Sequence, residues 1–295
     1  MKAVILLGLF ILALNKPWIS RKELEMIKKV SPFEVADYDD LVFKDWTDEE
    51  IQSMLSYKSD ALKAAKIHEE VNIDIKNRYY DFHASHRECT LYMKNQQSCG
   101  SCWAFATTSV LEKRYCYRTT GRMNVPLSPQ YTVSCDPYNQ ACRGGNPASA
   151  FRFLAERGTV TYDCVPYTAG YGYVEPCMDR CKNGQQLIFY RGQGDYVIAG
   201  VEQIMNEIEQ NGPVFVGIVC YSDFMAYRGG IYRHTSGQYR GMHAVLAYGF
   251  GSQGGINYWI GQNSWGQNWG ESGTFRMAFG ECGIESDVHG THPVV

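Results

Sequence analysis

Cysteines constrain this chain of 295 residues more than any other feature of its sequence. The chain has eleven of them, and ten lie between Cys89 and Cys220. Such a density is typical of proteins that pass through an oxidising compartment, where cysteines pair as disulfides. Because the count is odd, at least one thiol stays unpaired, and that thiol requires a separate explanation.

The first residues of the chain indicate export. Lys2 precedes an apolar run over residues 3–14, which has the length of a signal-peptide core and is too short to cross a bilayer. A buried N-terminal helix is the alternative. We predict a signal peptide over residues 1–14, a route through the secretory pathway to a lysosome, a vacuole or the outside, and no membrane segment in the mature form. A formal net charge of −3 gives no reason to expect nucleic acid as a partner.

The amino-acid composition of the chain changes near residue 76. Residues 15–75 lack cysteine and are rich in charge. Their apolar spacing and caps predict helices over residues 20–30, after the capping-box sequence that begins at Thr47, and over residues 60–70. We expect a small helical module here.

Beyond residue 76, glycine, tyrosine and cysteine become frequent, and helical patterns precede strand patterns. The predicted helices cover residues 101–117, 148–157 and 201–210, and the predicted strands cover residues 214–220, 244–250, 257–261 and 274–278. This order predicts an α+β domain with two packed halves over residues 76–295.

Residues 96–105, with the sequence QQSCGSCWAF, hold two cysteines three positions apart. Such a pair can form a redox site or half of a zinc site. The sequence has no second ligand pair of matching spacing and no βαβ pattern, so neither interpretation is favoured. Cys102 falls at the expected N-terminus of a helix, where the dipole and the free N–H groups favour a thiolate. We therefore predict that Cys102 is the reactive thiol.

A reactive thiolate needs a proton partner, and His243 stands at the start of an apolar strand. Asn263 lies near Trp265 and Trp269, which suggests a hydrogen bond shielded from water. The other six histidines are interpreted as structural or surface residues: His68, His83, His86, His234, His289 and His292.

Taken together, these residues resemble those of the papain family of cysteine proteases. Cys102 lies in the sequence CGSCW, His243 follows it by 141 residues, and Asn263 follows it by 161, slightly beyond the usual spacing. The sequences CGIES around Cys282 and VCYSDF around Cys220 are similar to the cathepsin B group of that family. The resemblance implies a papain-like two-lobe fold, with the cysteine on a helical lobe and the histidine and asparagine on a β-barrel-like lobe. It also implies that residues 15–75 form a helical, inhibitory propeptide.

The resemblance implies a role for each residue of the constellation. Cys102 would be the nucleophile and His243 the base and acid, as a thiolate–imidazolium pair. Asn263 would orient the imidazole, and Trp265 would cover their bond. The Gln96 side chain and the Cys102 backbone N–H would stabilise the oxyanion. The reaction would be peptide hydrolysis through a thioester, without a cofactor or a metal.

Further positions match the family's substrate-binding residues. Gly100, Gly144 and Gly145 would let the substrate backbone approach closely. Pro147, Ala244 and Asp287 would line the pocket for the second side chain before the cut, and an acid there would admit Arg or Lys beside apolar residues. For Asp287, an ordinary surface acid is an equally good interpretation.

The resemblance also implies four disulfide pairs: Cys89–Cys116, Cys99–Cys142, Cys135–Cys177 and Cys164–Cys181. It leaves Cys220 and Cys282 unassigned. In cathepsin B a long loop with two adjacent histidines blocks one end of the cleft, whereas residues 164–181 are short and contain no histidine. We therefore expect an open cleft and an enzyme that is mainly an endopeptidase.

The expected partners are peptide and protein substrates, the chain's own propeptide and cystatin-type inhibitors, and the expected state is a monomer. Two alternatives stay open. A peptide ligase or transferase would use the same thioester, and a papain-fold protein that has lost activity would only bind. The presence of Cys102, His243, Asn263 and Gln96 argues against the second alternative.

Overall fold

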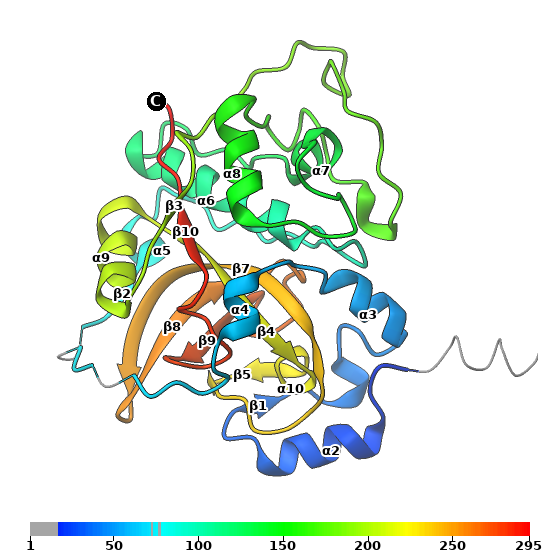
Figure 1. Cartoon of the computed structure of the whole chain (residues 1–295), viewed down its shortest axis with the longest axis vertical. Helices are drawn as coiled ribbons and strands as arrows, with labels where there is room; N and C mark the ends of the chain where they lie inside the picture. The colour runs from blue at the N-terminus through cyan, green and yellow to red at the C-terminus, as the bar shows by residue number, and fades with distance from the viewer. Residues whose placement is uncertain (1–16, 72, 76–77) are drawn as a thin grey trace, which may run out of the picture.

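The computed structural model describes residues 17–71, 73–75 and 78–295, so the predicted signal peptide lies outside the described residues. Figure 1 shows a half built of helices, a half built on a curved sheet, and an N-terminal module that packs against the sheet half. Among the described residues, no helix combines the length and the apolar character that a membrane span requires. The architecture is the predicted two-lobe α+β fold.

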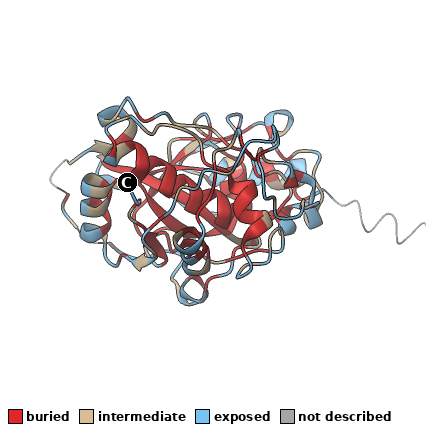
Figure 2. Ribbon diagram, turned by 90° about the horizontal axis from the view of Figure 1, so that it is seen from above, coloured by how far each residue is buried: buried red, intermediate tan, exposed pale blue. Residues whose placement is uncertain are grey.

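The helical half is organised around α6 (Cys102–Arg118), which is buried from Cys102 to Cys116. Its threonine hydroxyls donate to carbonyls of the preceding turn, as Thr108 does to Ala104 at 2.7 Å, so the buried polar groups are satisfied. Two shorter helices pack beside it, α7 (Pro129–Cys135) and α8 (Pro147–Glu156), each with a side-chain N-cap and a proline in its first turn. Figure 2 shows the buried helices at the centre of the molecule.

The sheet half contains an eight-stranded sheet in which β2 (Tyr80–Asp81) pairs with β7 beside the main path. The strands of that path are, in spatial order, β3 (Tyr196–Val197), β10 (Val288–Gly290), β4 (Val214–Tyr221), β7 (Tyr239–Gln253), β8 (Ile256–Gln262), β9 (Thr274–Ala278) and β6 (Ile231–Tyr232). Every residue of β4 is buried, which explains its unbroken apolar sequence. Three further helices flank this half: α5 (Phe82–Ser85), α9 (Val201–Asn211) and α10 (Ser222–Met225).

The N-terminal module carries α2 (Arg21–Val30), β1 (Glu34–Val35), η1 (Tyr38–Asp40), α3 (Asp48–Met54) and α4 (Asp60–Ala64). The capping box at Thr47 is present, as predicted. β1 pairs with β5 (Tyr227–Gly229), so the module adds a small sheet to the sheet half. The apolar face of α2 is buried through Leu24 and Ile27.

The prediction of a helix over residues 60–70 was wrong in extent, because α4 ends at Ala64. The chain then runs extended, and Glu69 N–H donates to the Gly280 carbonyl at 2.8 Å. This tertiary hydrogen bonding replaces the helical bonds that the local sequence would permit. The sequence patterns also missed α7 and β10.

Four disulfide bonds join the same pairs that the family resemblance implies: Cys89–Cys116, Cys99–Cys142, Cys135–Cys177 and Cys164–Cys181. All of them belong to the helical half and its loops. Cys102, Cys220 and Cys282 are free and buried.

Candidate active site

Cys102 is the first residue of α6, at the contact between the helical half and the sheet half. Its side chain is fully buried. Burial raises the pKa of the Cys102 thiol to about 12, although backbone hydrogen bonds at Ala244 and Trp103 act in the opposite direction. With the cleft covered, the thiol is therefore protonated.

His243 lies on β7 and Asn263 follows the end of β8. The His243 Nε2 and Asn263 Oδ1 atoms are 2.7 Å apart, and the Trp265 ring stacks on the imidazole at 4.7 Å between centroids. Because an amide oxygen can only accept, Nε2 carries the proton, and Nδ1 of the neutral ring is left as an acceptor. Burial lowers the pKa of His243 to about 4. In the covered form, burial therefore disfavours the charged state of both groups, and the thiolate–imidazolium pair stays a prediction for the open enzyme.

The Gln96 side chain makes three hydrogen bonds in the cleft. Its Nε2 donates to the Cys99 carbonyl at 2.9 Å and to the Met54 carbonyl of the N-terminal module at 3.1 Å. Its Oε1 accepts from Ser264 Oγ at 2.6 Å, which fixes the orientation of the amide. The Met54 carbonyl therefore accepts a hydrogen bond from the Gln96 side-chain amide, which is the group expected to stabilise the oxyanion.

The segment after Met54 runs extended through the cleft. Tyr57 N–H donates to the Met242 carbonyl at 3.3 Å, and Lys58 N–H donates to the Gly145 carbonyl at 3.1 Å. A Cβ on Gly144 would lie 2.0 Å from the Ser56 carbonyl oxygen, and a Cβ on Gly100 would lie 1.8 Å from Ser56 Oγ. These glycines are therefore required for the close approach of a second backbone.

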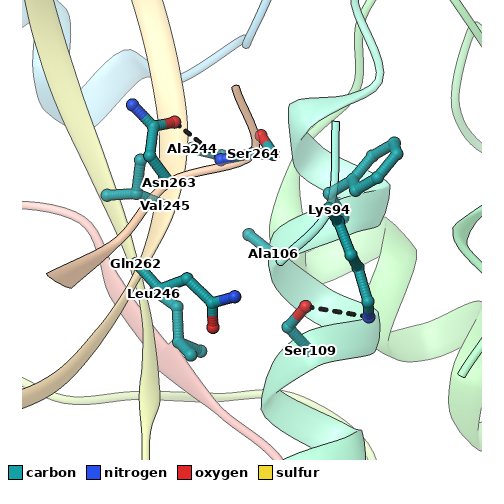
Figure 3. A pocket seen from close by; sticks show the side chains of 10 residues that line it. Lys94, Ala106, Ser109, Ala244, Val245, Leu246, Gln262, Asn263 and Ser264 are labelled. Carbon is teal, nitrogen blue, oxygen red and sulfur yellow. Dashed lines mark hydrogen bonds between the residues drawn. The ribbon is translucent and has the colours of Figure 1, made fainter. Parts of the chain in front are cut away.

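Tyr57 projects into a side pocket of the cleft. Its hydroxyl donates to Asp287 Oδ2 at 2.5 Å. A hollow of about 320 Å³ remains beside this contact, between residues 57–63 of the module and a wall that includes Pro147 and His289. Ala244 instead lines a small cavity between the two halves with Asn263 and Ser264 (Figure 3). In the same view, Lys94 and Ser109 are hydrogen-bonded on the wall that α6 forms.

Sequence reasoning missed several residues of this site. Ser264 orients Gln96, Tyr167 donates its hydroxyl to the Gln96 carbonyl at 2.9 Å, and His289 lies behind Asp287. The only sequence signal for Ser264 was its position beside Asn263. Tyr167 carried none, because it meets Gln96 from a distant segment. His289 lies only two positions from Asp287, but its second partner, Asp195, is 94 positions away.

Comparison with known proteins agrees with this geometry. The family model described as papain family cysteine protease matches residues 77–292. The cathepsin B-like CP3 of Giardia intestinalis is 37% identical over 288 residues, covering 94% of this chain and 95% of its own. Cathepsin B of Dictyostelium discoideum is 36% identical over 211 residues, covering 66% and 67%. The solved procathepsin B S9 from Trypanosoma congolense superposes with a TM-score of 0.82 at 25% identity, covering 95% of this chain and 99% of its own.

The fold and the site thus define a cysteine protease with a segment laid through its cleft. The chain belongs to the papain family of cysteine proteases. Within that family it is similar to cathepsin B-like proteins and to a procathepsin B structure.

Proposed function

We propose that the protein is the zymogen of a peptidase that uses Cys102 as its nucleophile. The observation that carries this proposal is a segment of the N-terminal module in the cleft, beside a thiol at a helix N-terminus and an imidazole held by Asn263. The carbonyl of Met54, the last residue of α3, accepts from Gln96 at the start of that segment. The proposed boundaries are residues 1–14 for the signal peptide, 15–75 for the propeptide and 76–295 for the peptidase.

In the proposed reaction, His243 Nδ1 takes the thiol proton once the cleft is open to solvent. The sulfur of Cys102 then attacks the peptide carbonyl carbon, and the oxyanion is stabilised by Gln96 Nε2 and the Cys102 N–H. The C–N bond breaks, His243 returns the proton to the leaving amine, and a thioester remains. Water, deprotonated by the same imidazole, hydrolyses the thioester.

The propeptide would inhibit by lying in the cleft in the direction opposite to a substrate. Tyr57 fills the pocket predicted for the second side chain before the cut, and it comes after Met54 in the chain. In a substrate that side chain would come before the reacting carbonyl. The reversed direction misplaces the peptide bond for attack by Cys102, so the segment can bind without being cut.

We further propose that the mature enzyme is mainly an endopeptidase in a compartment of the secretory pathway. Residues 164–181 are closed by one disulfide and contain no histidine that could hold a substrate carboxylate. Four disulfides support an oxidising compartment. Internal cleavage of a quenched peptide should exceed dipeptide release from a free C-terminus by about 100-fold or more, an estimate based on the loss of one charge-assisted contact. Comparable rates would contradict the endopeptidase assignment.

Labelling with an epoxide inhibitor of papain-like enzymes tests the function directly. The acid-processed wild type should be labelled, whereas the unprocessed chain and the Cys102→Ala variant should not. Labelling of Cys102→Ala at the wild-type level would reject Cys102 as the nucleophile. Incubation of a peptide substrate with an amine acceptor distinguishes the alternative, since a ligase or transferase would give mainly the aminolysis product.

A further inference from the structure

The Asp287 carboxylate is occupied on both of its oxygens. Oδ2 accepts from the Tyr57 hydroxyl, and Oδ1 lies 3.0 Å from His289 Nε2. Burial raises the pKa of the Asp287 carboxyl, but hydrogen bonds from His289 and from the propeptide outweigh it and hold the pKa below its ordinary value. Asp287 is therefore a charged acceptor: His289 holds Oδ1, and Oδ2 would become available to a substrate once Tyr57 leaves the pocket.

His289 is held between two carboxylates. Its second ring nitrogen, Nδ1, lies 2.8 Å from Asp195 Oδ1. A neutral imidazole has a single N–H and could donate to only one of them, so the two contacts together require the imidazolium. The two carboxylates raise the pKa of His289 to about 9 although burial lowers it. A positive charge therefore stands directly behind Asp287 at neutral and acid pH.

This arrangement disfavours a cationic side chain in the pocket. An arginine binds a carboxylate best through two parallel bonds to both oxygens, and His289 already uses Oδ1. An incoming guanidinium or ammonium would also meet an Asp287 carboxylate whose charge is partly offset by the imidazolium, which Asp195 pairs from its other side. A neutral hydroxyl needs only Oδ2 and meets no like charge.

The rest of the pocket fits a phenol ring. The Tyr57 and Phe215 rings are 5.6 Å apart at 56°, a tilted contact that aromatic pairs favour. A Cβ on Gly217 would lie 2.8 Å from Tyr57 Cε1, so the absence of a side chain there makes room for the ring.

We propose that this pocket selects tyrosine as the second side chain before the cut, and that His289 is the positioning residue that sets this preference over arginine or lysine. The inference rests on the proposed peptidase function and narrows the expectation that Asp287 admits basic side chains. After the propeptide leaves, the substrate's tyrosine takes the place of Tyr57, with its hydroxyl on Asp287 Oδ2.

The test expresses the full-length chain, processes it with acid, and measures cleavage of quenched peptides. The peptides differ only in the second residue before the cut, which is Tyr, Phe, Arg or Leu. For the wild type, kcat/KM should be about 10-fold higher for Tyr than for Phe, the value of one hydrogen bond to a charged acceptor. In Asp287→Ala the two should become equal. In His289→Gln, which replaces the imidazolium with an uncharged side chain that can still donate to Asp287, the Arg-to-Tyr ratio of kcat/KM should rise about 10-fold through KM, with each value normalised to that of the Leu peptide in the same variant.

Asp195→Asn provides an independent variant, because it removes the anion that holds the imidazolium without touching the pocket. It should also raise the Arg-to-Tyr ratio, and this result decides the matter if His289→Gln does not fold. Failure of the wild type to cleave any of these peptides or to react with the epoxide would reject the proposed function itself. An active wild type that cleaves Phe as well as Tyr, or Arg better than Tyr, would overturn only the pocket assignment.

Discussion

Two parts of the propeptide bind the peptidase by different means. Residues 17–50, here called the clamp, contact the sheet half through side chains: the Phe33 ring packs on Tyr232, and the Phe43 ring packs on Trp265. Residues 55–59, here called the cleft strand, bind largely through backbone groups, with Tyr57 as the main side-chain anchor. The clamp is thus specific to its own sequence, whereas the cleft strand uses contacts that any extended peptide could make. The difference would allow one cleft to accept both the proposed inhibitory segment and different substrates.

Gly144→Ala should have the largest effect, because it would weaken the binding of the cleft strand and of substrates alike. The new Cβ would meet the Ser56 carbonyl at 2.0 Å, at a φ of +102° that already disfavours a side chain. We expect kcat/KM of the processed enzyme to fall by about 100-fold or more, the scale of a misplaced substrate. Gly172→Ala is the matched control, since Gly172 has a φ of +90° and nothing within 4 Å of the added Cβ. Similar losses in both variants would attribute the effect to backbone strain and not to the cleft.

Acid should release the cleft strand through His243. Burial lowers the pKa of His243 to about 4 in the covered form, below its ordinary value near 6.5. The pKa of His243 is thus lower in the covered form than in the open form. As the pH falls below 6.5, the open form binds a proton that the covered form does not, so acid favours opening. The opening equilibrium should therefore rise by up to about tenfold per pH unit between pH 6.5 and pH 4.

Hydrogen exchange of the Tyr57 amide measures this opening, because that N–H is bonded to the Met242 carbonyl only in the covered form. The inactive Cys102→Ala zymogen prevents self-processing during the measurement. Its protection factor should fall with acid, and the fall should be absent in the Cys102→Ala, His243→Ala double variant. An equal fall in both proteins would assign the acid response to other groups.

The structural features that could be predicted from the sequence are those that neighbouring residues determine. The capping box at Thr47, the Asn146 cap and the apolar run of β4 depend on local chemistry, and the structure contains all of them. The candidate residues Cys102, His243 and Asn263 could be named because their local sequences resemble a known family, although their roles stay predictions.

The remaining features depend on contacts between distant segments. Tyr57 meets Asp287 from 230 positions away, and His289 acquires its charge from Asp195, 94 positions away. No window of the sequence contains both partners of either contact. The rise in the pKa of Cys102 in the covered form could not be predicted for the same reason, since it follows from burial that the whole fold creates.

The smallest effect is expected for a variant of the clamp that removes one charge in contact with Arg240. Arg240 is buried and donates to Asp48 Oδ1 and to the Trp18 carbonyl, so it joins α3 and the start of the clamp to β7. Asp48→Asn removes the charge of that pair and leaves the processed enzyme unchanged. Because the Asp48 side chain is 38% exposed, solvent screens the pair, and we expect the zymogen to process only about 5-fold faster.

The control for this variant is Glu49→Gln, which removes a charge of the same sign from the same first turn of α3 at an exposed position. This control reproduces any effect of the helix dipole and leaves the contact between Asp48 and Arg240 intact. Processing at a fixed pH, followed by the appearance of the mature fragment on a gel, should be accelerated in Asp48→Asn and stay close to wild type in Glu49→Gln. If the two variants process at the same rate, the Arg240 contact adds nothing to the binding of the clamp, which then rests on apolar burial and on the pairing of β1 with β5.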